Sequence, residues 1–234
     1  WHAWVRCVID GEEIDFWNLK KGKGRVRYAK TLELVEGGDH AGFVVEQEHV
    51  AFLGEEGVET VILRESFRVV AQGDGEAYLV DYETVQKNVS EFTLELPAYR
   101  YGGPIAYRAP HHWDVSNSDY LSSEGRTRLD GHATRSRWCS FSGANPGGEG
   151  VATLAILCHP GNHDAPQRMR VWPPKSNNGA IFFNYVPIQE TAWAIEPGQV
   201  STMRYRLIAT DSAPDPAGLD RSWEEYAVSV ADPR

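Results

Sequence analysis

The sequence predicts an all-β protein, a large antiparallel β-sandwich with one short C-terminal helix. Three observations support this fold class. Segments of strand length with alternating or β-branched side chains recur along the chain, and clusters of Gly, Asn, Asp and Pro separate them. Helical periodicity occurs only near the C-terminus. Short turns between successive strands favour antiparallel pairing in two packed sheets.

The first half of the chain reads as a series of hairpins. The turn sequences Glu-Gly-Gly-Asp, Gly-Glu-Glu-Gly and Gln-Gly-Asp-Gly follow the first three alternating segments. Such Gly- and Asp-rich turns are typical of connections between antiparallel strands. The predicted strands of this half are 24–35, 42–52, 59–70, 76–85 and 91–96.

The second half opens with a polar stretch that we expect to be irregular. Strands are then predicted at 137–141, 151–158, 168–171, 179–184, 192–195 and 202–209. Near the end, residues 216–228 begin with Pro and contain the run Ser-Trp-Glu-Glu-Tyr-Ala, which predicts a short helix. No internal repeat and no linker of altered composition interrupts the chain, so we expect a single domain over residues 1–234.

Charge and composition exclude several classes of function. The formal net charge of −10 argues against a nucleic-acid partner, which requires a basic surface. The sequence contains no apolar run long enough to span a membrane. A nucleophile elbow, a phosphate-binding loop and a dinucleotide-binding glycine motif are also missing, so serine-hydrolase, kinase and nicotinamide-dehydrogenase functions lack their usual support.

The N-terminus and the cysteines leave the compartment open. The chain starts with Trp1-His2-Ala3-Trp4, which reads as the middle of a strand, so we expect an upstream part of the domain to be missing. No signal peptide is recognisable. The three cysteines form no CxxC pair, and their odd number favours neither an oxidising nor a reducing compartment. Bacterial cytoplasm and periplasm both remain open, and a homo-oligomer is compatible with the sequence.

The most suggestive segment for chemistry is the polar loop at 158–166, which follows the most apolar strand. His159 and His163 have a spacing that binds zinc on a helix, but Pro160 and Gly161 prevent a regular helix here. Hydrogen bonding or proton transfer to a polar ligand fits His159 better, because histidine titrates near neutral pH. Asn162 is a candidate for binding the same ligand. The alternative is a loop whose polar side chains cap the ends of strands.

Three further clusters supply candidate ligand-binding residues. Arg108 follows two glycines and precedes His111-His112-Trp113, a combination typical of a pocket rim. Glu124, followed by Arg137 and Trp138, offers a carboxylate and a guanidinium near an aromatic ring, and a Glu with a His can serve as an acid–base pair on a carbohydrate. Asp15 and Trp17 would bind and stack a sugar ring. Solvated turns and core aromatics have the same composition.

Taken in order, these clusters resemble the PmoA-like family of bacterial proteins, which often carry the label "methane oxygenase". The matching positions are Gly11 to Trp17, 64–70, Ser123-Glu124-Gly125, Arg137-Trp138 to Gly143, His159-Pro160 with Asn162 and Pro166, Phe183-Asn184, Arg204 to Leu207, and Trp223 to Tyr226. The family also has an upstream stretch of the form Asp-His-Pro-His-His-Arg-Gly. Trp1 and His2 resemble the tail of that stretch.

The resemblance implies a galactose-mutarotase-like sandwich and a sugar-related role, with a divalent metal held by the missing upstream histidines. Membrane methane oxidation is not implied, because it requires a membrane-embedded copper assembly. The resemblance and the clusters lead to one hypothesis, a carbohydrate-active lyase, hydrolase or epimerase. Its predicted acid–base residues are His159 and Glu124, and its predicted substrate-binding residues are Asn162, Arg137, Trp138, Asp15, Trp17 and Arg108.

Two alternatives use the same residues without catalysis. The first is a carbohydrate-binding or accessory module, which binds a glycan and releases no product. The second is a structural subunit of an oligomer, in which an open sheet edge recruits a partner. A structure that brings the predicted residues to one concave face would favour the enzyme.

Overall fold

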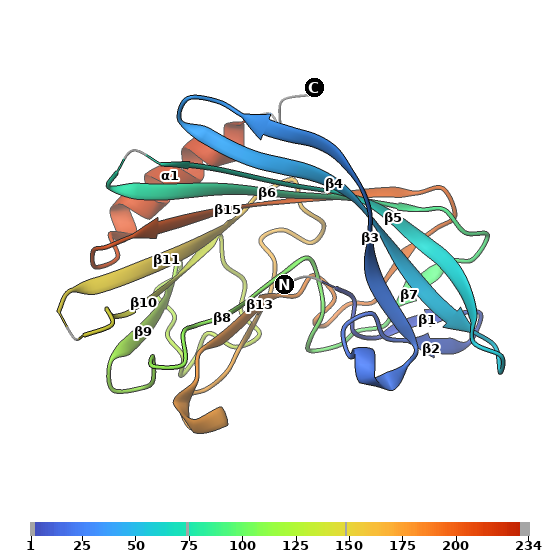
Figure 1. Ribbon diagram of the computed structural model, residues 1–234. Helices are drawn as coiled ribbons and strands as arrows, with labels where there is room; N and C mark the ends of the chain where they lie inside the picture. The colour runs from blue at the N-terminus through green and yellow to red at the C-terminus, as the bar shows by residue number, and fades with distance from the viewer. Residues whose placement is uncertain (1–2, 74, 148, 230–234) are drawn as a thin grey trace.

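An eight-stranded antiparallel sheet forms the larger layer of the computed structural model, which describes residues 3–73, 75–147 and 149–229 (Figure 1). Trp1 and His2 lie outside the described residues. The strands of this large sheet, in spatial order, are β3 (Gly24–Glu36), β4 (His40–Leu53), β5 (Val58–Gly73), β6 (Ala77–Asn88), β15 (Val200–Thr210), β11 (Val151–Cys158), β10 (Trp138–Ala144) and β9 (Ser118–Ser122).

Two smaller antiparallel sheets face the large sheet and form the second layer (Figure 1). One has the strand order β14 (Trp193–Ile195), β7 (Leu94–Leu96), β1 (Cys7–Ile9) and β2 (Glu12–Ile14). The other has the order β12 (Met169–Val171), β13 (Phe182–Tyr185) and β8 (Ile105–Arg108), and the short 3-10 helices η1 (Leu19–Lys21) and η2 (Asn177–Gly179) lie in connecting segments. The predicted large antiparallel β-sandwich is confirmed.

Alternation along the strands of the large sheet divides its side chains between two cores. On β11, Ile156 and Cys158 point into the main core between the layers. Ala155 and Leu157 point to the opposite face, where the C-terminal helix α1 (Pro216–Val228) covers them. Because both faces of β11 are buried, its sequence is a continuous apolar run rather than an alternating one. The predicted terminal helix is thereby confirmed, and within the described chain no helix is long and apolar enough to cross a membrane.

A buried polar network links the large sheet to the N-terminal segment. The Glu65 carboxylate contacts His49 Nε2 at 2.9 Å and accepts hydrogen bonds from Thr84 and from Gln86 Nε2 at 3.2 Å. Gln86 Oε1 in turn accepts a hydrogen bond from Trp4 Nε1 at 3.0 Å. His49 and Glu65 are fully buried. Buried polar groups are stable when they satisfy one another in this way.

The polar stretch that was expected to be irregular contains two short strands, β8 and β9. β8 has only 4 residues and β9 only 5, so neither shows enough alternation to be recognised. Gly102 and Gly103 precede β8 with φ values of 100° and 129°, a conformation that favours glycine. A Cβ on Gly103 would lie 2.8 Å from the Tyr185 carbonyl oxygen, so this turn also needs glycine for close packing.

Candidate functional site

His159 lies at the end of β11 and packs against α1. Its ring meets the Tyr226 ring edge-on at 5.2 Å, and its Nδ1 accepts a hydrogen bond from the Gly161 backbone at 3.0 Å. Its buried Nε2 has no hydrogen-bond partner in the described structure. Burial, with the nearby Arg204 charge, lowers the pKa of His159. This histidine is therefore held neutral in a packing position beside the helix.

Asn162 fastens the same loop to β15. Its Oδ1 accepts a hydrogen bond from the Arg204 backbone N–H at 2.7 Å, and its Nδ2 donates to the Arg204 carbonyl at 2.8 Å. The side chain is almost fully buried and continues the pairing of β15 at Arg204, just past the end of β11 at Cys158. Both polar ends of its amide group are used within the fold.

Arg137 and Trp138 hold α1 on the large sheet. Trp138 Nε1 and Arg137 Nη2 both donate to Asp220 Oδ1 at 2.9 Å, and the Arg137 guanidinium lies 5.1 Å from the ring centre of Trp223. Trp138 itself is buried in the small core under the helix. Glu124 is exposed at the edge of this cluster, 3.9 Å from Arg137 Nε. These contacts dock a helix.

The predicted site residues are not gathered on one face of the molecule. His159, Arg137 and Trp138 contact α1 on the outer side of the large sheet, and Glu124 borders them there. The physical reason is the alternation of β10 and β11, which sends Trp138 and its neighbours outward to the helix. Neither His159 nor Glu124 is among the residues that line the aromatic cleft described below.

The spacing of His159 and His163 does not produce a metal site either. His163 stacks on Trp193 at 4.0 Å between ring centres, whereas His159 packs on Tyr226. Among residues 3–73, 75–147 and 149–229, no group of three or more His, Cys, Asp or Glu side chains is arranged to hold a metal ion. The upstream histidines implied by the resemblance are not part of this sequence, so a metal held by them stays a prediction.

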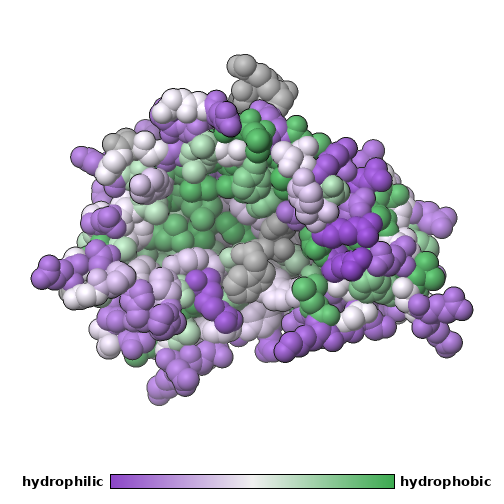
Figure 2. Space-filling model, in the orientation of Figure 1, coloured by the Kyte–Doolittle hydropathy of each residue, from purple (hydrophilic) through white to green (hydrophobic). Residues whose placement is uncertain are grey.

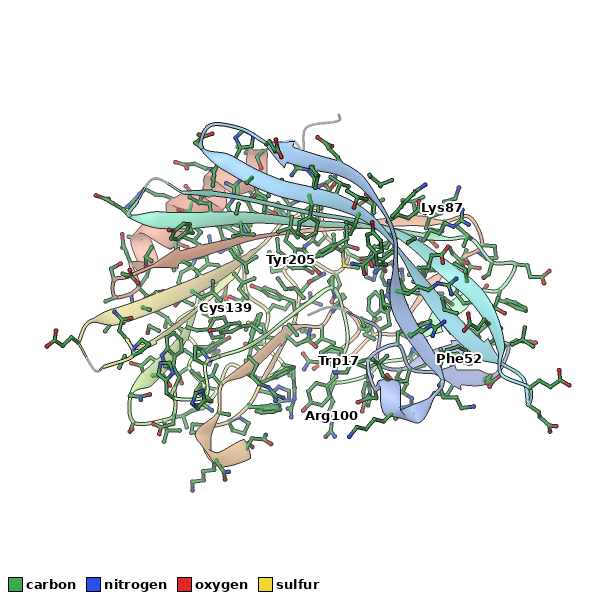
Figure 3. All side chains as sticks on the ribbon, viewed as in Figure 1. Trp17, Phe52, Lys87, Arg100, Cys139 and Tyr205 are labelled. Atoms are coloured by element: carbon green, nitrogen blue, oxygen red, sulfur yellow. The ribbon has the colours of Figure 1, made fainter. Side chains whose placement is uncertain are left out.

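Two other predicted residues, Trp17 and Arg108, line a single cleft between the two smaller sheets. We call it the aromatic cleft. It has a volume of about 240 Å³ and is lined by Val5, Trp17, Asn18, Tyr99, Tyr101, Arg108, Trp172 and Phe182. Figure 3 labels Trp17 and Arg100 in the lower half of the molecule, and Arg100 is the sequence neighbour of two lining tyrosines. Segments from four distant parts of the chain thus supply its walls.

Asp15 shapes one wall of the cleft without lining it. Its Oδ1 accepts hydrogen bonds from the backbone N–H groups of Trp17 and Asn18 at 2.9 and 2.8 Å, and its Oδ2 accepts from Asn18 Nδ2 at 2.7 Å. Lys21 Nζ lies 2.8 Å from the same Oδ2. Burial raises the pKa of Asp15, but the Lys21 and Asn18 hydrogen bonds outweigh it and lower the pKa. The charged carboxylate therefore fixes the turn that presents Trp17.

Trp172 forms the opposite wall. Its ring stacks on Phe182 at 4.8 Å, and the Arg108 guanidinium lies 5.1 Å from its centre. Its Nε1 donates a hydrogen bond to Tyr101 Oη at 3.0 Å. Arg128, which is largely buried, donates to the carbonyls of Trp172, Gly179 and Ala180 and so clamps the loop that follows Trp172. These contacts anchor the wall to the rest of the fold.

Tyr101 lies among hydrogen-bond donors and positive charges at the cleft. Its hydroxyl oxygen accepts hydrogen bonds from Trp172 Nε1 and, at 3.3 Å, from Arg170 Nη2. The guanidinium groups of Arg170 and Arg100 lie 5.0 and 5.4 Å from its ring centre. Burial raises its pKa, but these hydrogen bonds and positive charges lower it below the usual tyrosine value. The cleft therefore favours negative charge at this position.

Sequence reasoning missed Trp172, Arg170, Arg100, Asn18 and Phe182. Trp172 and Arg170 belong to the segment around β12, which shows only the pattern of a short strand. The run Tyr99-Arg100-Tyr101 could have indicated the cleft, because it combines aromatic and basic residues immediately before the glycines that precede β8. His111 and His112, predicted at a pocket rim beside Arg108, are exposed and are not among the residues that line the cleft.

A second hollow lies between the large sheet and the strands below it, where Figure 2 shows hydrophobic residues gathered. Aromatic rings cross this inner face of the sheet: Phe43 contacts Phe67, Phe67 contacts Tyr82 at 4.9 Å, and Tyr82 contacts Tyr205 at 6.0 Å. Tyr82 donates its hydroxyl hydrogen to the Pro104 carbonyl, so its polar end is used within the fold.

Comparison with protein families gives one match. A family described as "Family of unknown function (DUF6807)" matches residues 1–224. A search of curated proteins by sequence found no significant match. The family description assigns no activity, and the resemblance to the PmoA-like family stays a prediction.

Solved structures show similarity of fold. The chain is similar to a GH36 α-galactosidase from Geobacillus stearothermophilus, solved with raffinose (TM-score 0.51, 11% identity) and with stachyose (TM-score 0.52, 10% identity). Each match covers 89% of this chain and 30% of the α-galactosidase chain. The α-galactosidase from Lactobacillus brevis has a TM-score of 0.49 at 11% identity, with 89% of this chain and 29% of that chain covered. At these identities the similarity shows the fold alone.

Proposed function

We propose that this chain, which belongs to the DUF6807 family, binds a carbohydrate in the aromatic cleft. One observation carries the proposal. The cleft combines the flat rings of Trp17, Tyr99, Tyr101 and Trp172 with the hydrogen-bonding side chains of Asn18 and Arg108.

A sugar ring has apolar C–H faces and a rim of hydroxyl groups. Trp and Tyr rings present a flat apolar surface with a polar edge, which matches the faces of such a ring. Asn18 and Arg108 supply donors for hydroxyl oxygens at the rim. A mostly apolar opening with a few placed polar groups is the usual form of a small-molecule site.

The walls are also fixed before binding, which supports recognition. Asp15 holds the turn that carries Trp17, and Arg128 holds the loop that follows Trp172. A site whose side chains are already ordered loses less conformational entropy when a ligand binds. The fold found in an α-galactosidase fits a carbohydrate-related role, but at 10–11% identity the ligand argument rests on the cleft.

Catalysis at the same cleft is a second candidate function. The predicted acid–base pair His159 and Glu124 is not in the cleft, so an enzyme would need another group there. Tyr101 is that candidate, because its lowered pKa makes it a better base than an ordinary tyrosine. Loss of turnover in Tyr101→Phe, with product formed by the wild type from glycosides or 3-keto-glycosides, would favour the enzyme over a binding module.

Binding is tested with a glycan array followed by titration calorimetry on the best glycan. We expect saturable binding and at least a tenfold loss of affinity in Trp172→Ala. Trp193→Ala is the matched control, since Trp193 is a partly buried tryptophan that does not line the cleft. The proposal fails if no glycan binds, or if Trp193→Ala and Trp172→Ala weaken binding equally while both variants stay folded.

A further inference from the structure

Three guanidinium groups gather around the aromatic cleft of a protein whose net charge is −10. Arg108 lines the cleft and lies over Trp172 at 5.1 Å. Arg170 and Arg100 lie at 5.0 and 5.4 Å from the centre of the Tyr101 ring, on the tyrosine that forms part of the wall. The cleft is therefore locally positive in a protein that is acidic as a whole.

Two of these charges have no carboxylate partner in the described structure. Neither Arg100 nor Arg170 forms an ion pair with any described residue, whereas arginines elsewhere, such as Arg27 and Arg206, pair with Glu or Asp. Arg170 instead contacts neutral groups: its Nη2 donates to Tyr101 Oη and its Nη1 lies 3.1 Å from His132 Nε2. Its buried Nε has no hydrogen-bond partner among the described residues.

The neighbours of Arg170 keep its charge available. Burial and the positive charges of Arg170 and Arg100 lower the pKa of His132, so this ring stays neutral and its Nε2 accepts from Arg170. Carboxylates lie farther off: Glu13 pairs with Arg6, and Asp15 is buried against Lys21. Because no carboxylate among the described residues pairs with Arg100 or Arg170, a ligand with negative charge gains more here than a neutral one.

We propose that the aromatic cleft selects acidic sugars, with the carboxylate of a uronic acid bound by Arg100, Arg108 and Arg170 and the sugar ring stacked on the cleft's aromatic walls. A guanidinium has a planar set of N–H donors that matches a carboxylate in two parallel hydrogen bonds. This inference rests on the proposed function, because it names the class of carbohydrate that the same cleft takes.

The test compares sugars that differ only at the carboxylate. Calorimetric titrations use methyl β-glucuronide against methyl β-glucoside, methyl α-galacturonide against methyl α-galactoside, and an α-1,4-linked galacturonic acid trimer. We expect at least a tenfold preference for the acid of each bound pair at low salt. Arg170→Met should reduce that preference to about twofold or less, and the exposed Arg100→Met, which leaves the wall intact, should reduce it at least threefold.

Arg64→Met is the matched control. Arg64 is an exposed arginine on the large sheet, away from the residues that line the cleft, and its loss should leave the preference unchanged. Equal affinity for acidic and neutral sugars would overturn this inference and leave the proposed function standing. Binding of no sugar on the array or in titrations would overturn both. Thermal unfolding of each variant shows whether it is folded. If Arg170→Met does not fold, the preference measured for Arg100→Met decides whether the inference holds.

Discussion

Asp15 shows how one buried carboxylate organises a ligand-binding wall. It accepts hydrogen bonds from Trp17 and Asn18, two and three residues after it in the chain, and lies against Lys21. It was predicted to bind the sugar directly, yet it is 1% exposed and lies behind the wall. Its role in the account is to position Trp17 and Asn18.

Replacing Asp15 by Asn should weaken both the fold and the cleft. The amide keeps the volume but leaves Lys21 without its charged partner and offers a donor where Asn18 needs an acceptor. We expect a loss of about 1–3 kcal/mol in the free energy of unfolding, measured with denaturant, and weaker glycan binding. Asp114→Asn, at an exposed turn of similar hydrogen bonding, should change neither by as much.

The pH dependence of this substitution has a defined sign. The folded-state pKa of Asp15 lies below its ordinary value of 3.8, so its contribution to stability is present above that value and is lost as pH falls through the folded pKa. Wild type should therefore lose stability faster than Asp15→Asn below about pH 4. Identical acid unfolding profiles would contradict the assigned role.

Tyr101 should ionise at lower pH than an ordinary tyrosine. Hydrogen bonds from Arg170 and Trp172 and the charge of Arg100 favour its phenolate, although burial opposes it. Burial raises the pKa of Tyr107, Tyr120 and Tyr185, so these do not obscure the early step. Ultraviolet titration should show one low-pKa transition that Tyr101→Phe removes and Arg170→Met moves to higher pH. An unchanged profile in Tyr101→Phe would refute this assignment.

Single residues in the sequence indicated part of the cleft. Trp17 and Arg108 were predicted as sugar-binding residues because each stands beside turn residues and other aromatics, and both line the cleft. Trp172 and Arg170 were not, since nothing local distinguishes a tryptophan that faces a cleft from one that fills a core. Their meeting with Tyr101 depends on the pairing of β12 with β13, a contact that spacing along the chain does not reveal.

At the scale of elements, α1 accounts for the residues that the sequence suggested as catalytic. Its Asp220 accepts hydrogen bonds from Arg137 and Trp138, and its Tyr226 packs on His159. The sequence shows these polar residues, but the helix that they contact begins some eighty residues after Arg137, so the contact is not apparent from the sequence. A polar cluster that docks a helix and one that binds a ligand have the same composition in sequence.

Replacing Asp220 by Ala should loosen the helix without affecting the cleft. Trp138 Nε1 is buried and would lose its acceptor, so we expect the free energy of unfolding to fall by about 1–3 kcal/mol. Glycan affinity should stay within twofold of wild type. Glu224→Ala, an exposed change on the same helix, should cost less than about 0.5 kcal/mol. A large loss of affinity in Asp220→Ala would instead support a ligand site beside α1.

Across the whole molecule, the fold was more predictable than the site. The long hairpins of β3 to β6 follow from alternation and Gly-rich turns, which are local signals. The second layer is harder to predict from the sequence, because its strands have 3 or 4 residues and several of them pair across long distances in sequence. The predicted homo-oligomer stays a prediction; β3 forms one edge of the large sheet, with Tyr28 and Leu34 exposed.

The buried network around Glu65 joins the two layers and should be costly to break. Glu65→Leu leaves His49, Thr84 and Gln86 without their shared acceptor, so we expect a loss of roughly 3–5 kcal/mol in the free energy of unfolding. His49→Leu combined with Glu65→Leu should recover part of it, because removing both partners leaves fewer unsatisfied groups. Denaturant unfolding measures both, and a cost below about 1 kcal/mol for Glu65→Leu would show that the network contributes little.

The central claim is that the aromatic cleft is where this protein binds sugar. A crystal structure with the tightest-binding glycan tests it most directly. We predict a sugar ring in van der Waals contact with Trp172 or Trp17, about 3.5–4 Å from the aromatic plane, with its polar groups toward Asn18 and Arg108. A glycan seated instead in the apolar hollow beneath the large sheet, or beside α1, would contradict the claim.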